Sequence, residues 1–500
     1  MKPFNVKNKF YKFSSFIIIL LFSSCKDFYD ITPGNRVTPE EHYQSIVDAE
    51  TSFKGAFALL QDVAPNLVLV NELLADLTDV TSNYDADMLD INLHNCSPDN
   101  KFTSPTGYYK IIITANEALA HIESIMEKDQ DYTNFENKII RGYLVGLRSW
   151  AYFTLVRLYG EAAYLEDNIV ALPDNLNLNY YNREEMIDIL IIDLDTLLGG
   201  DRDRNRVLGY LDLNNEYTLY CMYNRALMGE LYLEKNNYEK AAEYLKMAIE
   251  GYENRYFKVG TSYQKENWKN IFINSHSFND EVMVAVPFSL DNNQLNPLEN
   301  WTASEREYLI QPSSYIINLF NSQKTSDGKN GDIHRGFGVS YDSTKNIKVI
   351  NKHILDKSIP ASSDIILYRA ADIHLLYAEA LNRLGDQANA LQLLNSGYKD
   401  AGGAWRTSLG VRGRVYLTPK GISQAATDKT AYLEDLIMDE RAMELAFEGK
   451  RWFDLMRVAR RRGNDYLANK VAAKFSDADT AQQIHDLLME EANWYLPFNK

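Results

Sequence analysis

The stretch that decides the fold is DERAMELAFEGKRWFDLMRVA, residues 439–459. Its apolar residues recur at helical spacing, and Glu440 and Glu444 stand four positions apart, so their carboxylates share one helix face. A glycosidase would need two carboxyl groups that face one sugar across a cleft. Acids on one helix among basic neighbours are instead typical of an ion-pair network. The basic residues expected in this network are Arg441, Lys450, Arg451 and Arg457.

Helical periodicity continues over most of the chain. The amphipathic stretches are 39–62, 108–128, 134–160, 184–199, 216–234, 238–252, 364–384, 387–396, 431–447 and 482–491. The pattern breaks over about 76–107, 255–363 and 399–428, where Asn, Ser, Gly and Pro accumulate. The middle block contains short strand-like runs, such as EVMVAVPF (281–288) and IKVI (347–350). We predict a mainly α fold that forms one globular body with long irregular loops and a few short strands.

A repeat lies within the helical frame. Two sets of five residues have the same internal spacing, and their first residues, Gly229 and Ala378, stand 149 positions apart. Small residues at the first, third and last places let two antiparallel helices pack closely, as in tetratricopeptide repeats. We expect dispersed helical pairs that either dock a protein partner or serve as scaffold. The two sets are Gly229, Tyr232, Ala241, Leu245, Ala248 and Ala378, Leu381, Ala390, Leu394, Gly397.

The N-terminus has the composition of an export signal. Four lysines precede an apolar run, Phe16 to Phe22, which is far shorter than the ~20 residues that span a bilayer. Ser23 and Ser24 then precede Cys25 in an arrangement that resembles a bacterial lipobox. An acylated cysteine would be a firm membrane anchor. We therefore predict a signal peptide at 1–24, lipidation at Cys25, an N-terminal helical region at 25–265 and a C-terminal region at 266–500.

Composition excludes several classes of function. The net charge of −17 argues against nucleic-acid binding, and the basic run RVARRR (457–462) reads as a solvated helix end. Cys96 and Cys221, the cysteines beyond Cys25, do not suffice for a disulfide scaffold. Nucleophile, zinc and nucleotide motifs are missing from the sequence. The segment 201–212 imitates a calcium loop but carries Arg206 where the turn requires Gly, so neither a metal nor a cofactor is expected.

Several segments together resemble one family. They are GLRSWAYFTLVRLYGEAAYL (146–165), ILYRAADIHLLYAEALNRLG (366–385), residues 439–459 and the terminal WYLPFNK (494–500). NDEVMVAVPF (279–288) and QPSSYIINLF (311–320) follow the same order. The chain is identified as a member of the RagB/SusD family, and the resemblance covers essentially the whole mature chain.

The resemblance implies a surface-exposed outer-membrane lipoprotein of a Bacteroidetes-type bacterium. Such a protein is not an enzyme. It binds an oligosaccharide or polysaccharide and sits as a lid on a TonB-dependent (SusC-like) transporter in the outer membrane. An alternative keeps the fold and the partner but replaces the glycan by peptides or another nutrient. An anchored hydrolase would require two carboxylates that meet across the loops.

Candidate ligand residues lie in the irregular blocks. Trp150, Trp452 and Trp494 fall inside the family signatures and are expected in the core. The other three tryptophans, Trp268, Trp301 and Trp405, lie outside these signatures. An indole offers a flat apolar face to a sugar ring. The ligand-binding residues that we predict are Trp301, Asn300, Glu305, Asn83, Tyr84 and Asp79.

Two further features bear on the ligand. Other family members carry a Trp before the Y-x-x-I helix, but this chain has Thr106-Gly107 before Tyr108, which removes one possible platform. The acidic chain would repel a polyanionic glycan unless a basic patch such as Arg412 and Arg414 received it.

Overall fold

A computed structural model describes residues 38–165, 178–197, 221–251, 257–273, 281–336, 341–342, 347–354, 363–407 and 409–499. The expected signal peptide, Cys25 and the calcium-like segment 201–212 lie outside these residues. The predicted boundary between the N-terminal region 25–265 and the C-terminal region 266–500 stays a prediction.

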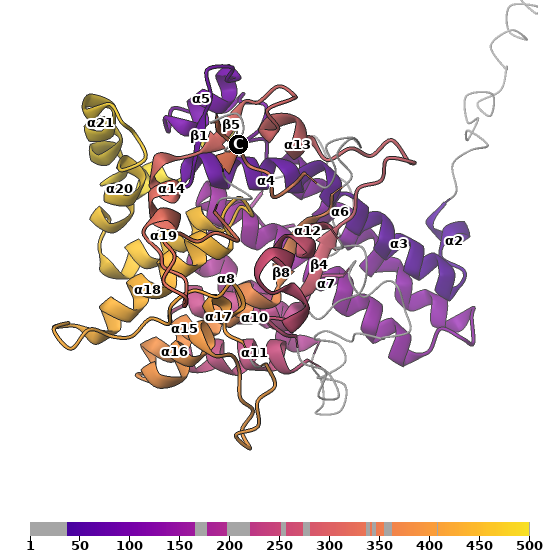
Figure 1. Ribbon diagram of the computed structural model, residues 1–500. Coiled ribbons are helices and arrows are strands. Elements are labelled where there is room, and N and C mark those ends of the chain that lie inside the picture. Colours follow the sequence, from indigo (N-terminus) through magenta and orange to yellow (C-terminus); the bar gives the residue numbers. More distant parts are fainter. Residues whose placement is uncertain are drawn as a thin grey trace, which may run out of the picture.

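Helices form most of the described chain (Figure 1). The first half contains α2 (Pro39–His42), α3 (Ile46–Ala58), α4 (Leu60–Leu74), α5 (Ala86–Asn92), α6 (Thr106–His121), η2 (Ile122–Glu127), α7 (Asn134–Tyr159), α8 (Arg183–Thr196), α10 (Asn224–Glu234) and α11 (Tyr238–Glu250). The second half contains η4 (Thr261–Tyr263), η5 (Lys265–Lys269), α12 (Asn270–Ile273), α13 (Pro297–Thr302), α14 (Ser314–Asn321), α15 (Ala370–Arg383), α16 (Gln387–Asn395), α17 (Val411–Arg414), α18 (Lys429–Glu444), α19 (Arg451–Arg462), α20 (Asp465–Ala472), α21 (Ala478–Leu488) and η6 (Glu491–Trp494).

Short strands form antiparallel pairs in the described chain, and β1–β5 and β4–β8 join segments that are distant in sequence. The strands are β1 (Thr78–Val80), β2 (Glu161–Ala163), β3 (Tyr180–Asn182), β4 (Val282–Val286), β5 (Ile310–Pro312), β6 (Tyr341–Asp342), β7 (Ile347–Lys348) and β8 (Ile365–Arg369). They pair as β1 with β5, β2 with β3, β4 with β8 and β6 with β7. The prediction of a mainly α fold with few short strands is confirmed.

Helix α7 illustrates how the sequence sets the element boundaries. Thr133 and Glu136 form a capping box at its start, and Gly160 ends it with φ +80°, a conformation that glycine adopts without steric cost. Nearly every residue from Leu144 onward is buried. A helix that is buried on all sides belongs in the centre of the body, and α7 lies there, between α6 and α8.

The two repeat-bearing pairs form helical hairpins, α10–α11 and α15–α16, as predicted. A Cβ at Gly229 would lie 2.6 Å from the Leu245 side chain, so the small residue permits the close packing of α10 and α11. The pairs are dispersed in sequence, yet α11 packs directly on α15. They therefore join into one helical layer that belongs to the scaffold.

One hydrophobic core extends from Tyr43 to Leu496 and draws on both halves of the chain. Trp150, Trp452 and Trp494 are buried in it, as expected. The most apolar window of Ile46–Leu74, the stretch comprising α3 and α4, could cross a membrane by composition, but 72% of it is buried inside the protein. A smaller cluster surrounds Trp268. Trp268 is fully buried, so its indole presents no face to a ligand.

The quoted stretch 439–459 forms two helices, α18 and α19, and not one. Phe447 and Gly449 have φ values of +67° and +70°, which the α-helix does not allow, so the chain turns between them. The region 364–384 likewise begins as strand β8 before α15 starts, because Ile365 and Ile366 pair with β4 and the whole strand is buried on both faces.

The ion-pair network predicted for this stretch exists, but its partners come from further afield. Glu444 accepts from Arg335 at 2.9 Å, from Arg369 at 2.7 Å and from Arg414. Glu440 accepts from Arg335 at 2.8 Å and from Arg412 at 2.6 Å. The network contains five acids and five bases, all buried: Glu281, Asp332, Glu440, Glu444, Glu448, Arg335, Lys352, Arg369, Arg412 and Arg414.

Two sequence interpretations of basic residues are therefore wrong. Arg412 and Arg414 are buried in this network and form no surface patch for an anionic glycan. The run 457–462 is not a solvated helix end, because Arg457 pairs with Glu379 and Asp454 while Arg461 pairs with Glu379 and Glu434. Burial of a positive charge requires such pairing.

We expect Glu444→Gln to lower the free energy of unfolding by about 3–5 kcal/mol, because three buried guanidinium groups would lose a shared counter-charge. Chemical denaturation of the soluble chain measures this loss. Glu243→Gln removes the exposed pair with Lys240 and should cost no more than about 0.5 kcal/mol. Equal effects of the two substitutions would contradict the role assigned to the network.

Glu72 provides a pH-dependent prediction. It accepts hydrogen bonds from the backbone N–H of Gly449 at 2.9 Å and from Thr78 Oγ1 at 3.1 Å, and burial raises its pKa to about 7 from 4.5. Because the folded pKa exceeds the unfolded one, the native state binds more protons between these values, and stability falls as pH rises from 4.5 to 7.

The difference in unfolding free energy between wild type and Glu72→Gln should therefore shrink by up to ~3 kcal/mol over this range, at about 1.4 kcal/mol for each pKa unit. Denaturation of both proteins across the pH series measures the difference. A difference that is independent of pH would show that the burial of Glu72 does not shift its titration.

Candidate functional site

The candidate site is built on the β1–β5 pair. Asp79 in β1 lies opposite Gln311 in β5, and Gln311 Nε2 donates to the Val80 carbonyl at 3.0 Å. The pairing continues beyond the strands, where the Thr81 N–H donates to the Leu309 carbonyl at 2.8 Å. Two irregular blocks that are more than 200 residues apart in sequence thus lie side by side, at the edge of the molecule that carries α5 and α13 (Figure 1).

Trp301 lies on the short helix α13 and not in an irregular loop as the sequence suggested. The Asn296 side chain caps this helix by accepting from the Leu298 N–H. The indole of Trp301 is half-buried and meets the Phe102 ring edge to face, with ring centres 5.6 Å apart. One part of the Trp301 side chain is therefore held against the body of the protein, and the other part is open to solvent.

The other predicted residues gather on the same two blocks. Asn300 is half-buried, and Glu305 is exposed and accepts from Ser304 Oγ at 2.9 Å. Asn83 is exposed and donates to the Glu307 carbonyl at 3.3 Å, and Tyr84 is 47% exposed.

Asp79 is the predicted residue with the most internal contacts. Its Oδ1 accepts from the Val80 N–H at 2.8 Å and from Asn92 Nδ2 at 3.0 Å. The carboxylate is half-buried, so it chiefly fixes the turn between β1 and α5.

Trp405 lies apart from these residues. It is 48% exposed in the segment between α16 and α17, and Lys399 Nζ lies 4.4 Å from its ring centre. In Figure 1, α16 lies toward the lower edge of the molecule, whereas α13 lies near its upper edge.

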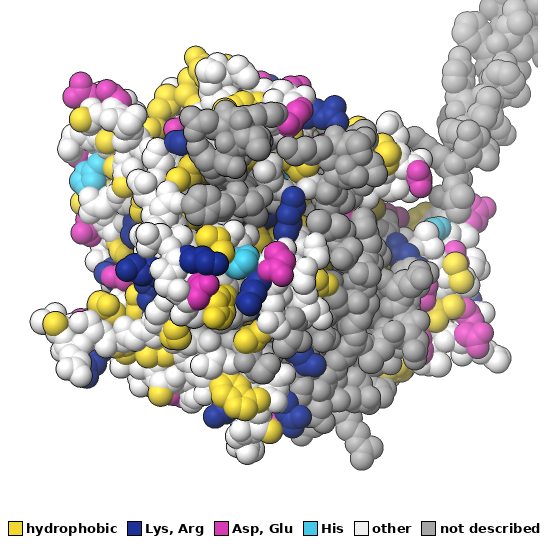
Figure 2. All heavy atoms as spheres, in the orientation of Figure 1, with side chains coloured by type: hydrophobic (Ala, Val, Ile, Leu, Met, Phe, Trp, Pro, Cys, Tyr) yellow, Lys and Arg dark blue, Asp and Glu magenta, His cyan; other side chains and the backbone are white. Residues whose placement is uncertain are grey.

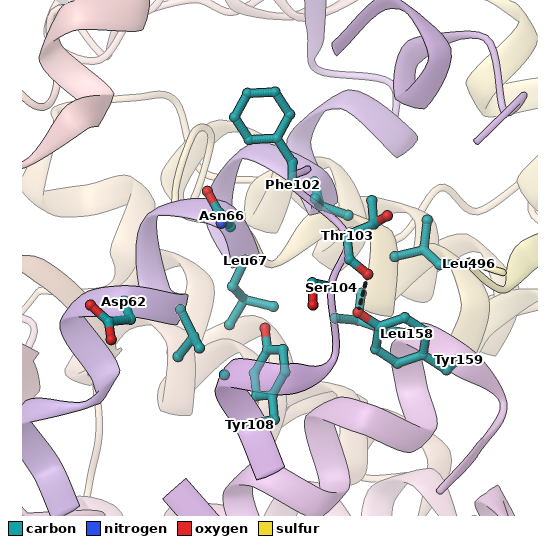
Figure 3. Close-up of a pocket in the computed structure, with 13 residues that line it drawn as sticks. Asp62, Asn66, Leu67, Phe102, Thr103, Ser104, Tyr108, Leu158, Tyr159 and Leu496 are labelled. Carbon is teal, nitrogen blue, oxygen red and sulfur yellow. Dashed lines mark hydrogen bonds between the residues drawn. The ribbon is translucent and has the colours of Figure 1, made fainter. Parts of the chain in front are cut away.

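A pocket of 140 Å³ lies between α4 and the start of α6 (Figure 3). Phe102 belongs both to the Phe102–Trp301 contact and to the pocket lining. Helix α4 supplies one wall, the start of α6 supplies another, and Leu158, Tyr159 and Leu496 close a third side. Tyr159 is fixed because its hydroxyl donates to the Thr103 carbonyl at 2.6 Å. The lining residues are Asp62, Val63, Asn66, Leu67, Val70, Phe102, Thr103, Ser104, Gly107, Tyr108, Leu158, Tyr159 and Leu496.

Hydroxyl, amide and carboxylate groups face this pocket among apolar walls. Burial raises the pKa of the Tyr108 hydroxyl well above its usual value, so the group is a neutral donor and acceptor. Charge is mixed on the face shown in Figure 2, where basic and acidic side chains alternate and the described atoms form no large patch of one sign.

Sequence reasoning singled out Gly107 and Tyr108 but missed the other residues that line the pocket. Asn66 and Leu67 lie on α4, which reads as a core helix, and Phe102 carried no distinctive motif. Tyr308 was also missed. It has φ +51° and its hydroxyl donates to the Lys348 carbonyl at 2.5 Å, so it fixes the turn into β5. Among the described residues no group of three or more His, Cys, Asp or Glu side chains could hold a metal ion.

Comparisons with known proteins agree with this architecture. The SusD family model matches residues 234–498, and a second model, described as "Starch-binding associating with outer membrane", matches residues 27–187. The chain is 23% identical to SusD-like protein P38 of Formosa agariphila over 92% of both chains.

Two solved structures illustrate the likeness of fold. Surface glycan-binding protein A from Bacteroides uniformis has a TM-score of 0.67 and 17% identity, with 90% of this chain and 95% of that chain covered. A laminarin binding SusD-like protein has a TM-score of 0.62 and 16% identity, with 88% and 96% covered. The chain therefore belongs to the SusD/RagB family of non-catalytic glycan-binding proteins associated with the outer membrane.

Proposed function

We propose that this protein is a lipid-anchored, surface-exposed binding protein that captures a glycan and delivers it to a TonB-dependent transporter in the outer membrane. The observation that carries the proposal is the Phe102–Trp301 pair at the rim of a pocket with polar groups. Aromatic rings bind the apolar face of a sugar, while hydroxyl and amide groups bind its hydroxyls.

The arrangement of the rim suits an oligosaccharide. Trp301 and Phe102 lie at one end of the pocket, and the exposed Tyr84 and Asn83 lie on the adjoining block. The β1–β5 pairing holds both blocks in register, so the groups are positioned before the ligand arrives. Preorganisation of this kind reduces the entropy lost on binding.

The charge distribution favours a neutral glycan. Arg412 and Arg414 are buried, and basic and acidic groups are interspersed on the face shown in Figure 2. The net charge of −17 opposes a polyanion. A neutral α- or β-glucan is therefore the ligand class that we favour, and two relatives named for glycan or laminarin binding support it.

The membrane anchor and the transporter rest on the sequence and the family. Cys25 follows a short apolar run and two serines, and a multiply acylated cysteine provides firm anchoring. The family model that matches residues 27–187 is described by association with the outer membrane. A transporter that accepts the bound glycan would complete the uptake route.

The proposal predicts saturable binding of at least one neutral polysaccharide to the soluble chain without residues 1–25. Calorimetric titration against laminarin, starch and acidic polysaccharides measures it. Trp301→Ala should weaken binding at least about tenfold, because the ring loses its stacking contact.

Trp405→Ala is the matched control, because it removes an exposed indole that belongs neither to the lining of the pocket nor to the Phe102–Trp301 contact. Binding that survives Trp301→Ala but is lost in Trp405→Ala would show that the glycan binds at Trp405 and not at Trp301. Failure of every glycan to bind would contradict the proposal and favour peptides or another nutrient as the ligand.

A further inference from the structure

Tyr108 is a buried tyrosine with an unpaired hydroxyl. It is only 4% exposed, yet its hydroxyl has no hydrogen-bond partner in the described part of the chain. Six other buried tyrosines of the described chain donate to an acceptor: Tyr132, Tyr152, Tyr159, Tyr223, Tyr368 and Tyr398. Native proteins pair nearly all buried polar groups, so an unpaired one needs an explanation.

The hydroxyl of Tyr108 points into the pocket between Leu67 and Ser104 (Figure 3). Asn66 lies above it and Asp62 lies to its left, one helical turn apart on α4 (Figure 3), and their side chains have no hydrogen-bond partner among the described residues. The pocket therefore presents a donor–acceptor hydroxyl, a carboxylate and an amide to whatever fills it. This set matches a polyhydroxylated ligand.

Gly107 sets the shape of this pocket. A Cβ at this position would lie 2.4 Å from Val63 Cγ1, and valine is rigid on a helix. A larger residue would therefore displace α4 or the start of α6, which form two of the pocket walls. The resemblance to the family implied a Trp at this place, and this chain has Thr106-Gly107 there, so no indole fills the space beside α4.

The volume limits what enters. A water needs ~10–15 Å³ on this measure, so 140 Å³ holds on the order of ten water-sized groups. One sugar ring with its hydroxyls is of that size, and two linked rings are not. The remainder of an oligosaccharide must lie outside, where Phe102 and Trp301 form the rim.

We propose that this pocket binds one terminal sugar residue of the glycan, at a chain end or on a branch, through the Tyr108 hydroxyl. Asp62 and Asn66 bind further hydroxyls of the same ring, and the adjoining residues of the glycan contact Phe102 and Trp301. The inference rests on the proposed glycan-binding function and adds that the protein recognises glycan ends.

The test uses free monosaccharides, because each is small enough to fill the pocket alone. Saturation-transfer NMR with glucose, galactose, mannose, xylose and fucose should detect binding of at least one to the soluble chain. Tyr108→Phe should weaken that binding about 5–20-fold, the effect of one lost hydrogen bond. Its melting temperature should not fall, since the hydroxyl has no partner among the described residues.

Tyr132→Phe is the matched control with the opposite pattern. Its hydroxyl donates to Asn137 Oδ1 at 3.1 Å away from the pocket, so the substitution should lower the melting temperature and leave monosaccharide binding unchanged. The proposal is overturned if no monosaccharide binds, or if Tyr108→Phe binds as well as wild type. Polysaccharide binding that depends on Trp301 would still support the proposed function in either case, so the two failures are distinguishable.

Discussion

The buried carboxylate of Glu444 is the interaction on which the fold depends. It lies at the end of α18 and holds guanidinium groups from three other segments, Arg335, Arg369 and Arg414. The surrounding network is balanced, with five acids and five bases. Taking ten charges out of water is costly unless each finds its partner. The network therefore admits one arrangement of the second half of the chain, in which α17, α18 and β8 meet.

The same stretch fixes the candidate site through Arg451. Its guanidinium donates to both carboxylate oxygens of Asp76 at 2.8 Å, and Ser313 Oγ donates to the Asp76 carbonyl at 2.6 Å. Asp76 precedes β1 and Ser313 follows β5, so one bidentate pair sets the position of both strands. Bidentate pairs constrain orientation as well as distance. The stretch 439–459 thus also holds the two blocks that carry Trp301 and Tyr84.

The sequence sufficed for the helical frame, the paired repeats and the ion-pair character of 439–459, because these depend on local spacing. It also located the two blocks that carry the predicted ligand residues. It did not predict the partners of Glu440 and Glu444, since charge complementarity between residues 28 to 109 positions apart has no local signal. Arg412 and Arg414 were misread for the same reason: an arginine in a loop looks solvated until its buried partner is known. Asp62 and Asn66 of the pocket were missed because they lie on a helix that is otherwise core.

The replacement of a bulky platform by Thr106-Gly107 changes what kind of discrimination is available. An exposed aromatic face stacks on any sugar and therefore selects weakly. A pocket with an unpaired buried hydroxyl discriminates more strongly, because a ligand without the matching group leaves that hydroxyl unsatisfied. With Gly107 against Val63, the wall of α4 approaches closely enough to form such a pocket beside the Phe102–Trp301 rim. The shape of the pocket and its hydrogen bonds to one sugar ring of the glycan can then supply the specificity that a surface of mixed charge cannot.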